Sequence, residues 1–217
     1  MVRYNNSFNW MQTVLRSRIL SQSAVFEHGF GTRCSFELDG PRLKQIHSNL
    51  VLKTDSPDGL VGEGDALMTI RPGVAISIRT ADCYPILLAD SRNVAVAAIH
   101  AGWRGTAARI VDRTLETMAA EFGTQPRDII AAIGPGIGVC CFEVGDEVAR
   151  QFGYDRRTHL DLAFENRKQL EAAGVPSHNI EALGVCTFCD AERFFSYRRE
   201  KERAGRMTSY IRIVPGN

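Results

Sequence analysis

Two histidines and one cysteine are the residues whose chemistry stands out first. They are His47, Cys83 and His100, and each is expected where a strand meets a turn. Two imidazoles and a thiolate are good ligands for Zn²⁺, and catalytic zinc sites keep a fourth position for water or substrate. Bound zinc lowers the pKa of its water to about 7. The spacing is wider than that of a zinc finger, so the alternative stays open that the histidines are hydrogen-bonded structural residues and Cys83 a buried small side chain.

A glycine-rich bend begins at His100 and reads His-Ala-Gly-Trp-Arg-Gly. Such a bend at the start of a helix presents N–H groups and the positive end of the helix dipole to anions. Arg104 adds a guanidinium suited to a phosphate or carboxylate. The segment matches neither the phosphate loop nor the dinucleotide fingerprint, and ordinary turn glycines explain it equally well. Asp82 is interpreted mainly as a structural residue, although Asp82 and His28 are the candidates for proton transfer.

Four further cysteines are interpreted as packing residues. Cys186 and Cys189 form a single C-x-x-C for which the sequence indicates no partner pair. Cys140 and Cys141 are adjacent, which is awkward for joint chelation. The arginine-rich and aromatic segment 193–206 is either a solvated surface or an anion-binding region beside the site.

The hydropathy pattern predicts strands and helices of an α+β fold with antiparallel or mixed sheets. Val111, Leu115, Met118 and Phe122 form one apolar stripe at helical spacing, and Gly123 is a plausible stop. The run 94–99 is apolar throughout, as in a strand that is covered on both faces. The expected strands are 74–78, 85–89, 94–99, 128–133, 180–185 and 209–214, and the expected helices are 106–122, a short one marked by Val144, Val148 and Phe152, and 162–173.

Composition limits the possible functions of these 217 residues, which are interpreted as a single domain, 1–217. The formal net charge is +1, so the basic excess of a nucleic-acid-binding protein is absent. No stretch approaches 18 apolar residues, which argues against a membrane span. The first 20 residues lack the apolar core of an export signal, so we expect a cytoplasmic protein with reduced thiols.

Seven segments resemble, in this order, the laccase-domain family, long called multicopper polyphenol oxidoreductases. The words TADC and HAGWRG in correct order are highly specific for it. The segments are HGFGTR (28–33), KQIHS (44–48), GDALMT (64–69), TADCYPILLAD (80–90), AAIHAGWRGTAARIV (97–111), IGPGIGVCCFEVGDEV (133–148) and CTFCDAERFFSYRRE (186–200).

The resemblance implies a purine nucleoside phosphorylase that also has adenosine deaminase and S-methyl-5′-thioadenosine phosphorylase activity. It implies that His47, Cys83 and His100 bind Zn²⁺, with copper as a possible substitute, and serve as the catalytic residues. Arg33 and Arg104 are then expected to bind the substrates, purine nucleosides and phosphate. The implied fold is a layered α/β/β/α sandwich similar to the catalytic domain of cytotoxic necrotizing factor, in a cytoplasmic monomer. The segment between Arg33 and His47 is shorter than is usual in the family and lacks an asparagine-containing stretch and a helix that contributes to the family's substrate pocket.

Three other functions remain open. Cys83 could be a nucleophile with a histidine base, as in an amidase that edits a peptidoglycan precursor. Oxidation of phenols with copper is disfavoured, because a multicopper oxidase needs many more histidines than the five in this chain. A binding module without catalysis is the last alternative, motivated by the short segment.

Overall fold

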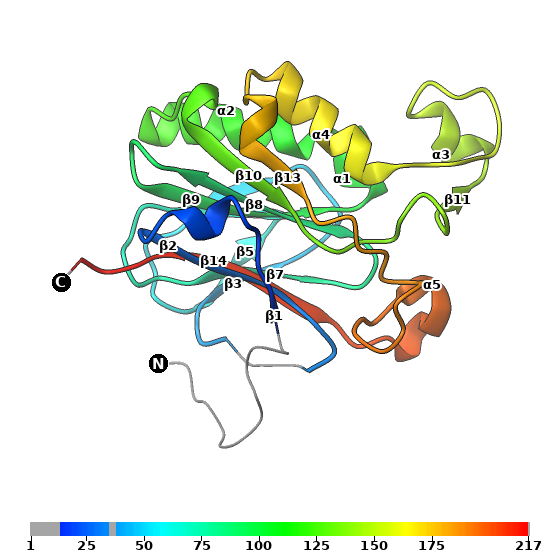
Figure 1. The fold of residues 1–217 in the computed structure, drawn as a ribbon, viewed down its shortest axis with the longest axis horizontal. Helices are drawn as coiled ribbons and strands as arrows, with labels where there is room; N and C mark the ends of the chain where they lie inside the picture. Colours follow the sequence, from blue (N-terminus) through cyan, green and yellow to red (C-terminus); the bar gives the residue numbers. More distant parts are fainter. Residues whose placement is uncertain (1–13, 35–37, 217) are drawn as a thin grey trace.

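Two stacked sheets form the centre of the molecule in the computed structural model, which describes residues 14–34 and 38–216 (Figure 1). The six-stranded sheet has the order β13 (Ile180–Ala182), β10 (Ile129–Ile133), β8 (Tyr84–Asp90), β9 (Ala95–Ala101), β6 (Ala66–Thr69) and β4 (Val51–Lys53). The four-stranded sheet has the order β1 (Val14–Leu15), β2 (Phe26–Gly31), β14 (Met207–Ile213) and β7 (Ile76–Thr80). Parallel pairs β10–β13 and β4–β6 make the larger sheet mixed.

Helices cover one face of the six-stranded sheet, and the four-stranded sheet covers the other (Figure 1). The α-helices are α1 (Trp103–Ala107), α2 (Ile110–Phe122), α3 (Asp146–Arg150), α4 (Leu162–Ala172) and α5 (Tyr197–Glu200). The short 3₁₀ turns are η2 (Leu20–Gln22), η3 (Pro126–Asp128), η4 (Ser177–Asn179) and η5 (Lys201–Arg203). None of the helices in the described residues has the length and hydropathy needed to cross a membrane.

The central pair β8–β9 is buried on both faces, as its sequence predicts. Ile86 and Leu88 pack under the helices, whereas Leu87 and Ala89 pack between the two sheets. Alternating side chains of a strand point to opposite faces, so a strand between two layers must be apolar at every residue. The antiparallel register brings Pro85 opposite His100, which places both strand ends at one edge of the sheet.

Helix α2 confirms the predicted apolar stripe and its stop. Val111, Leu115 and Met118 are buried against the sheet, and Gly123 ends the helix with a left-handed backbone of φ 71°. The predicted helix over residues 106–122 is wrong in its first part. It begins earlier, in α1, and is interrupted where Arg109 adopts φ 60°, a conformation incompatible with a continuous α-helix.

Other predicted elements agree with the structure in type and differ in extent. The strands at 74–78, 128–133, 180–185 and 209–214 correspond to β7, β10, β13 and β14, and the helix at 162–173 corresponds to α4. The short helix marked by Val144, Val148 and Phe152 is smaller than expected. Only α3 is helical there, because Val144 lies in strand β11 (Glu143–Val144), which pairs with β12 (Thr158–His159), and Phe152 lies in the turn that follows.

The α+β class with mixed sheets and stacked layers is confirmed, and the likeness to the cytotoxic necrotizing factor domain stays a prediction. In the shortened segment before His47, the structure describes strand β3 (Pro41–Lys44), which pairs with β5 (Gly59–Glu63). Residues 35–37 of that segment lie outside the described residues, as does most of the N-terminal stretch on which the expectation of no export signal rests.

Candidate functional site

The two predicted histidines and Cys83 meet at one edge of the six-stranded sheet. Their ligand atoms lie within 4.8 Å of one another. Cys83 directly precedes β8, His100 is the second-last residue of β9, and His47 follows β3. The prediction that His100 begins the glycine-rich bend is wrong by two residues, because β9 continues through Ala101. Strand pairing therefore fixes Cys83 and His100, whereas a turn brings His47 to them.

Asp65, a residue that the sequence analysis did not select, holds two of the three ligands in place. Its buried carboxylate accepts a hydrogen bond from His100 Nδ1 at 2.8 Å and from the backbone N–H of His47 at 3.0 Å. It also accepts bonds from the N–H and hydroxyl of Ser48, at 2.6 and 2.7 Å. A carboxylate acceptor keeps the proton on Nδ1 of His100, which leaves Nε2 as the ligand nitrogen. Asp65 lies in the word GDALMT, but only the sheet register shows that it faces His100.

Without a bound metal, the charges at this edge favour a thiolate at Cys83 and a protonated imidazole at His100. Burial raises the pKa of Cys83, but hydrogen bonds from His100 and His47 outweigh it and lower the pKa to about 6. Burial opposes the charged form of His100, yet the hydrogen bond to Asp65 raises its pKa to about 9. Burial also opposes the charge of Asp65, and the bonds from His100 and Ser48 lower its pKa to about 2. A thiolate and two imidazoles are the donor set that zinc prefers, so the residues fit such an ion.

A cavity of about 930 Å³ opens over the three ligands. Cationic side chains dominate its polar lining, and Asp82 is the acidic residue among them. The cations are Arg79, Arg104, Arg198, Lys201 and Arg206, and the apolar lining consists of Leu43, Ala81, Trp103, Ile137, Phe142, Leu162 and Ala204. Anionic groups and flat apolar groups are therefore the natural ligands of this cavity.

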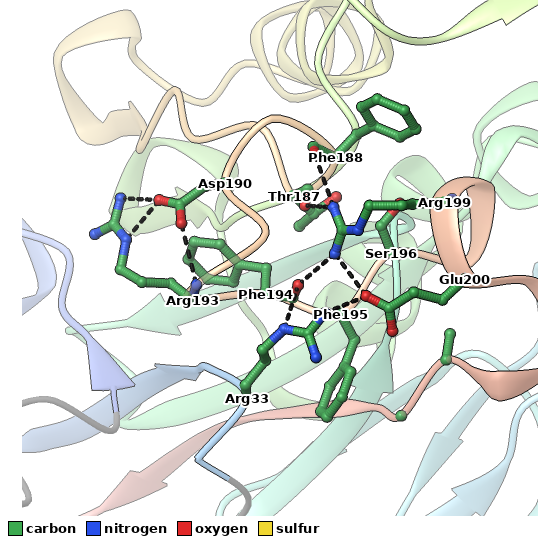
Figure 2. Close-up of polar contacts among 12 residues, drawn as sticks. Arg33, Thr187, Phe188, Asp190, Arg193, Phe194, Phe195, Ser196, Arg199 and Glu200 are labelled. Carbon is green, nitrogen blue, oxygen red and sulfur yellow. Dashed lines mark hydrogen bonds and ion pairs between the residues drawn. The ribbon is translucent and has the colours of Figure 1, made fainter.

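The two arginines predicted to bind substrate lie in different places. Arg104 lines the cavity, with its guanidinium 4.3 Å from the centre of the Trp103 ring. Arg33 is not part of the lining. Figure 2 shows its guanidinium directed at Glu200 and at the carbonyl of Phe194, which it reaches at 3.0 Å. A substrate-binding role of Arg33 stays a prediction, and its contacts here are those of a residue that supports the cavity wall.

The candidates for proton transfer are both engaged elsewhere. Asp82 has a left-handed backbone, and its carboxylate accepts bonds from Thr187 at 2.7 Å, Ser196 at 3.0 Å and the Arg198 N–H at 2.6 Å. These contacts support the structural interpretation of Asp82. His28 lies in β2, away from the cavity lining, and accepts a bond from the N–H of Ser17 at 2.9 Å.

Segment 193–206, for which the sequence left open a solvated surface or an anion-binding region, contributes cationic side chains to the cavity. Arg198, Lys201 and Arg206 all line it, which agrees with the predicted place beside the site. The expectation that the C-x-x-C of Cys186 and Cys189 has no partner pair is wrong, whereas Cys141 does pack against the core as expected. Cys140 and Cys141 come together with Cys186 and Cys189, and the four sulfurs lie within 4.8 Å of one another.

Comparison with known proteins gives a consistent family. A curated purine nucleoside phosphorylase of Bacteroides thetaiotaomicron is 45% identical over 163 residues, which cover 69% of this chain and 60% of that protein. Adenosine deaminase RL5 of an unknown prokaryotic organism is 41% identical over 169 residues, covering 71% of this chain and 64% of that protein. The chain thus spans less than two thirds of the length of these relatives.

A solved structure and a family description complete the comparison. YlmD from Geobacillus stearothermophilus has a TM-score of 0.81 and 28% identity, with 88% of this chain and 93% of that chain covered. The family described as multi-copper polyphenol oxidoreductase laccase matches residues 31–214. Because this match extends over most of the chain and the relative from Bacteroides thetaiotaomicron is 45% identical, the chain belongs to this laccase family.

Proposed function

We propose that this chain is a zinc-dependent purine nucleoside phosphorylase that also has adenosine deaminase and S-methyl-5′-thioadenosine phosphorylase activity. The observation that supports it most is the convergence of His47, Cys83 and His100 below a cationic cavity. The relatives named for nucleoside phosphorolysis and adenosine deamination give the substrate class. Zn²⁺ held by these three residues would supply a Lewis acid and a nucleophile at neutral pH.

The cavity lining contains both cationic and apolar side chains, which suit the two parts of such a substrate pair. Phosphate is an anion, and the guanidinium groups of Arg104 and Arg198 are suited to its oxygens. The purine is flat and largely apolar, and the ring of Phe142 and the side chain of Ile137 offer apolar surface to it. A volume of about 930 Å³ lies in the range of small-molecule sites.

Each proposed reaction needs only the nucleoside and either phosphate or water. In phosphorolysis an oxygen of phosphate forms a bond to C1′ of the ribose, the bond from C1′ to the purine breaks, and the leaving purine takes the electron pair and a proton. In deamination water replaces the amino group at C6 of adenosine, and ammonia leaves. The role of the cavity cations is to hold phosphate in line with the bond that breaks.

The direct test is release of hypoxanthine from inosine by purified, zinc-supplemented protein, measured by chromatography with and without phosphate. We expect release only with phosphate, formation of inosine from adenosine, and a loss of at least about 100-fold in Cys83→Ser. Cys34→Ser is the matched control, because Cys34 is an exposed cysteine outside the site. No turnover of inosine or adenosine by the zinc-supplemented protein would overturn the proposal.

A second candidate is a cysteine-dependent amidase acting on a peptidoglycan precursor. It is favoured by the lowered pKa of Cys83 beside two imidazoles, which is the arrangement of an activated thiol nucleophile. Chelation separates the two. A nucleophile site keeps its activity when metal is removed, whereas a metal site loses it, and Cys83→Ser abolishes both. Elemental analysis of the same samples distinguishes zinc from copper.

A further inference from the structure

A second group of thiols lies outside the cavity. Cys140 and Cys141 belong to the turn after Gly138, and Cys186 and Cys189 belong to the turn that follows β13. In an extended strand, adjacent side chains point to opposite faces. Here the chain turns instead, with hydrogen bonds from the N–H groups of Cys141 and Phe142 to the carbonyl of Gly138 at 2.9 and 3.0 Å. The turn allows both adjacent sulfurs to approach Cys189.

The distances between the sulfurs match those of a tetrahedral metal site. Sγ of Cys189 lies 3.7 Å from Sγ of Cys140 and 3.4 Å from Sγ of Cys141, and all four sulfurs lie within 4.8 Å of one another. Zinc–sulfur bonds of about 2.3 Å at tetrahedral angles place sulfurs about 3.8 Å apart. A disulfide requires about 2.05 Å, and all four cysteines are free thiols in the structure.

Backbone N–H groups are directed at the sulfur that is most enclosed. The N–H of Gly138 donates to Sγ of Cys186 at 3.2 Å, and those of Phe188 and Cys189 also point at it. Such bonds stabilise a thiolate and orient it as a ligand. A Cβ at residue 138 would lie 3.2 to 3.4 Å from Cys140 and Cys186, which is tighter than an ordinary contact, so glycine leaves the cysteines in place.

The geometry points to a structural zinc site formed by Cys140, Cys141, Cys186 and Cys189. A site with four thiolate ligands has no open coordination position, so it stabilises the chain and does not catalyse. Local sequence patterns do not connect the two pairs, because 44 residues lie between Cys141 and Cys186. The parallel pairing of β10 with β13, continued by the bridge between Gly136 and Cys186, brings the two pairs together.

The ion would join two segments that shape the cavity. Residues 137–142 contribute Ile137 and Phe142 to its lining. In the second segment, Thr187 donates to the carboxylate of Asp82, the residue before Cys83, at 2.7 Å. Arg199 donates to the carbonyls of Thr187 and Phe188, at 3.0 and 2.7 Å (Figure 2). Loss of the ion would therefore loosen one wall of the cavity.

The four-cysteine site is independent of the enzymatic activity, so its test measures the amount of bound metal. Reduced protein is purified, and zinc per chain is measured by elemental analysis in the wild type, Cys189→Ser, Cys83→Ser and Cys34→Ser. We expect Cys189→Ser to lose about one zinc ion relative to the wild type, and its thermal midpoint to fall by about 5 °C or more. Cys34→Ser changes neither, and Cys83→Ser keeps the ion of the four-cysteine site.

Cobalt keeps the test valid if Cys189→Ser does not fold. Metal-free Cys83→Ser protein is titrated with Co²⁺. This variant lacks the thiolate of the His-Cys-His site, so thiolate–cobalt absorption bands arise from the four-cysteine site. We expect intense visible bands of tetrahedral cobalt and sulfur-to-metal charge transfer at about one equivalent, displaced by zinc. Absence of these bands, zinc content unchanged in folded Cys189→Ser, or a disulfide among the four cysteines in freshly isolated protein would each overturn the proposal.

Discussion

At the scale of single residues, Asp65 positions two of the three proposed metal ligands. It binds the Nδ1 of His100 and the backbone of His47, so one buried carboxylate organises two ligands that lie far apart in sequence. Ser48 supplies two more donors, and together these bonds keep the carboxylate charged at any ordinary pH. Loss of such support around the ligands typically lowers metal affinity by about 10- to 100-fold.

The variant Asp65→Asn tests this role. We expect zinc affinity to fall by about 10- to 100-fold, because an amide no longer fixes the charge and the tautomer of His100. Competition with a chromophoric chelator measures the affinity. The matched control is Asp90→Asn, which alters another buried carboxylate, one that binds the turn residues Arg92 and Asn93. Equal affinity loss in both variants would show that Asp65 acts only through general stability.

His28 predicts a pH dependence of stability that is independent of the site. Burial, assisted by the charge of Arg16, lowers its pKa to about 4. Between pH 4 and about pH 6.5, His28 is protonated in the unfolded chain and neutral in the folded chain. The contribution of His28 to the free energy of unfolding is therefore fully present above about pH 6.5 and is lost as the pH decreases. The loss approaches roughly 3 kcal/mol by pH 4.

The measurement is urea unfolding of the wild type and of His28→Gln from pH 7.5 to 4. Glutamine can accept the Ser17 hydrogen bond through its side-chain oxygen but does not titrate. We expect the difference in unfolding free energy between the two proteins to narrow as the pH decreases. A constant difference across this range would contradict the lowered pKa.

At the scale of secondary-structure elements, the junction between β9 and α1 brings backbone close to the ligands. Gly102 is the residue before α1, and a Cβ on it would lie 2.8 Å from Sγ of Cys83 and 3.3 Å from Cδ2 of His47. Its φ of −80° is open to any residue, so glycine is required here for space and not for conformation. The lack of a side chain at Gly102, the first glycine of HAGWRG, therefore leaves the space that Cys83 and His47 occupy.

The variant Gly102→Ala should displace Cys83 and weaken metal binding, with little change in helix α1. Gly145→Ala is a close control, because Gly145 also precedes a short helix, with φ −73° and ψ 172°, and nothing lies within 4 Å of an added Cβ. We expect at least about a 10-fold loss of zinc affinity in the first variant and none in the second. Unchanged zinc affinity in Gly102→Ala would show that metal binding does not depend on the observed position of the Cys83 side chain.

The predictable elements are those with one strong local pattern. Strand β9 has continuous apolar residues and is packed on both faces, whereas helix α2 has periodic apolar residues and is packed on one face. Strand β2, with two glycines in six residues, has no such pattern and forms through its pairing with β14. The break at Arg109 was equally invisible, because it is a backbone conformation and not a change in hydropathy.

The same distinction explains the site. His47, Cys83 and His100 were found from the chemistry of their side chains and from motif words. Asp65 and the four-cysteine group were missed because their contacts depend on strand register and on the return of the chain after 35 residues or more.

At the scale of the whole molecule, the C-terminal segment closes the cavity by attaching to two other parts of the chain. Arg199 is the centre of this attachment (Figure 2). Its guanidinium donates to the carbonyls of Thr187 and Phe188 and to Phe194, and it pairs with Glu200, which also binds Arg33. A planar group with several fixed donors makes these contacts at once, and an ammonium does not.

The variant Arg199→Lys therefore keeps the charge and loses the geometry. We expect faster amide hydrogen exchange across residues 187–206, by about 10-fold or more, with zinc bound by His47, Cys83 and His100 unchanged. Arg193→Lys is the control from the same segment, because the Arg193 guanidinium makes a partly exposed ion pair of small energetic value with Asp190 and otherwise lies over the Phe194 ring. Mass spectrometry of exchanged peptides measures both variants. If Arg199→Lys left exchange in this segment as slow as in Arg193→Lys, the wall of the cavity would be held by the apolar contacts of Phe194 and Phe195, and the arginine network would be dispensable.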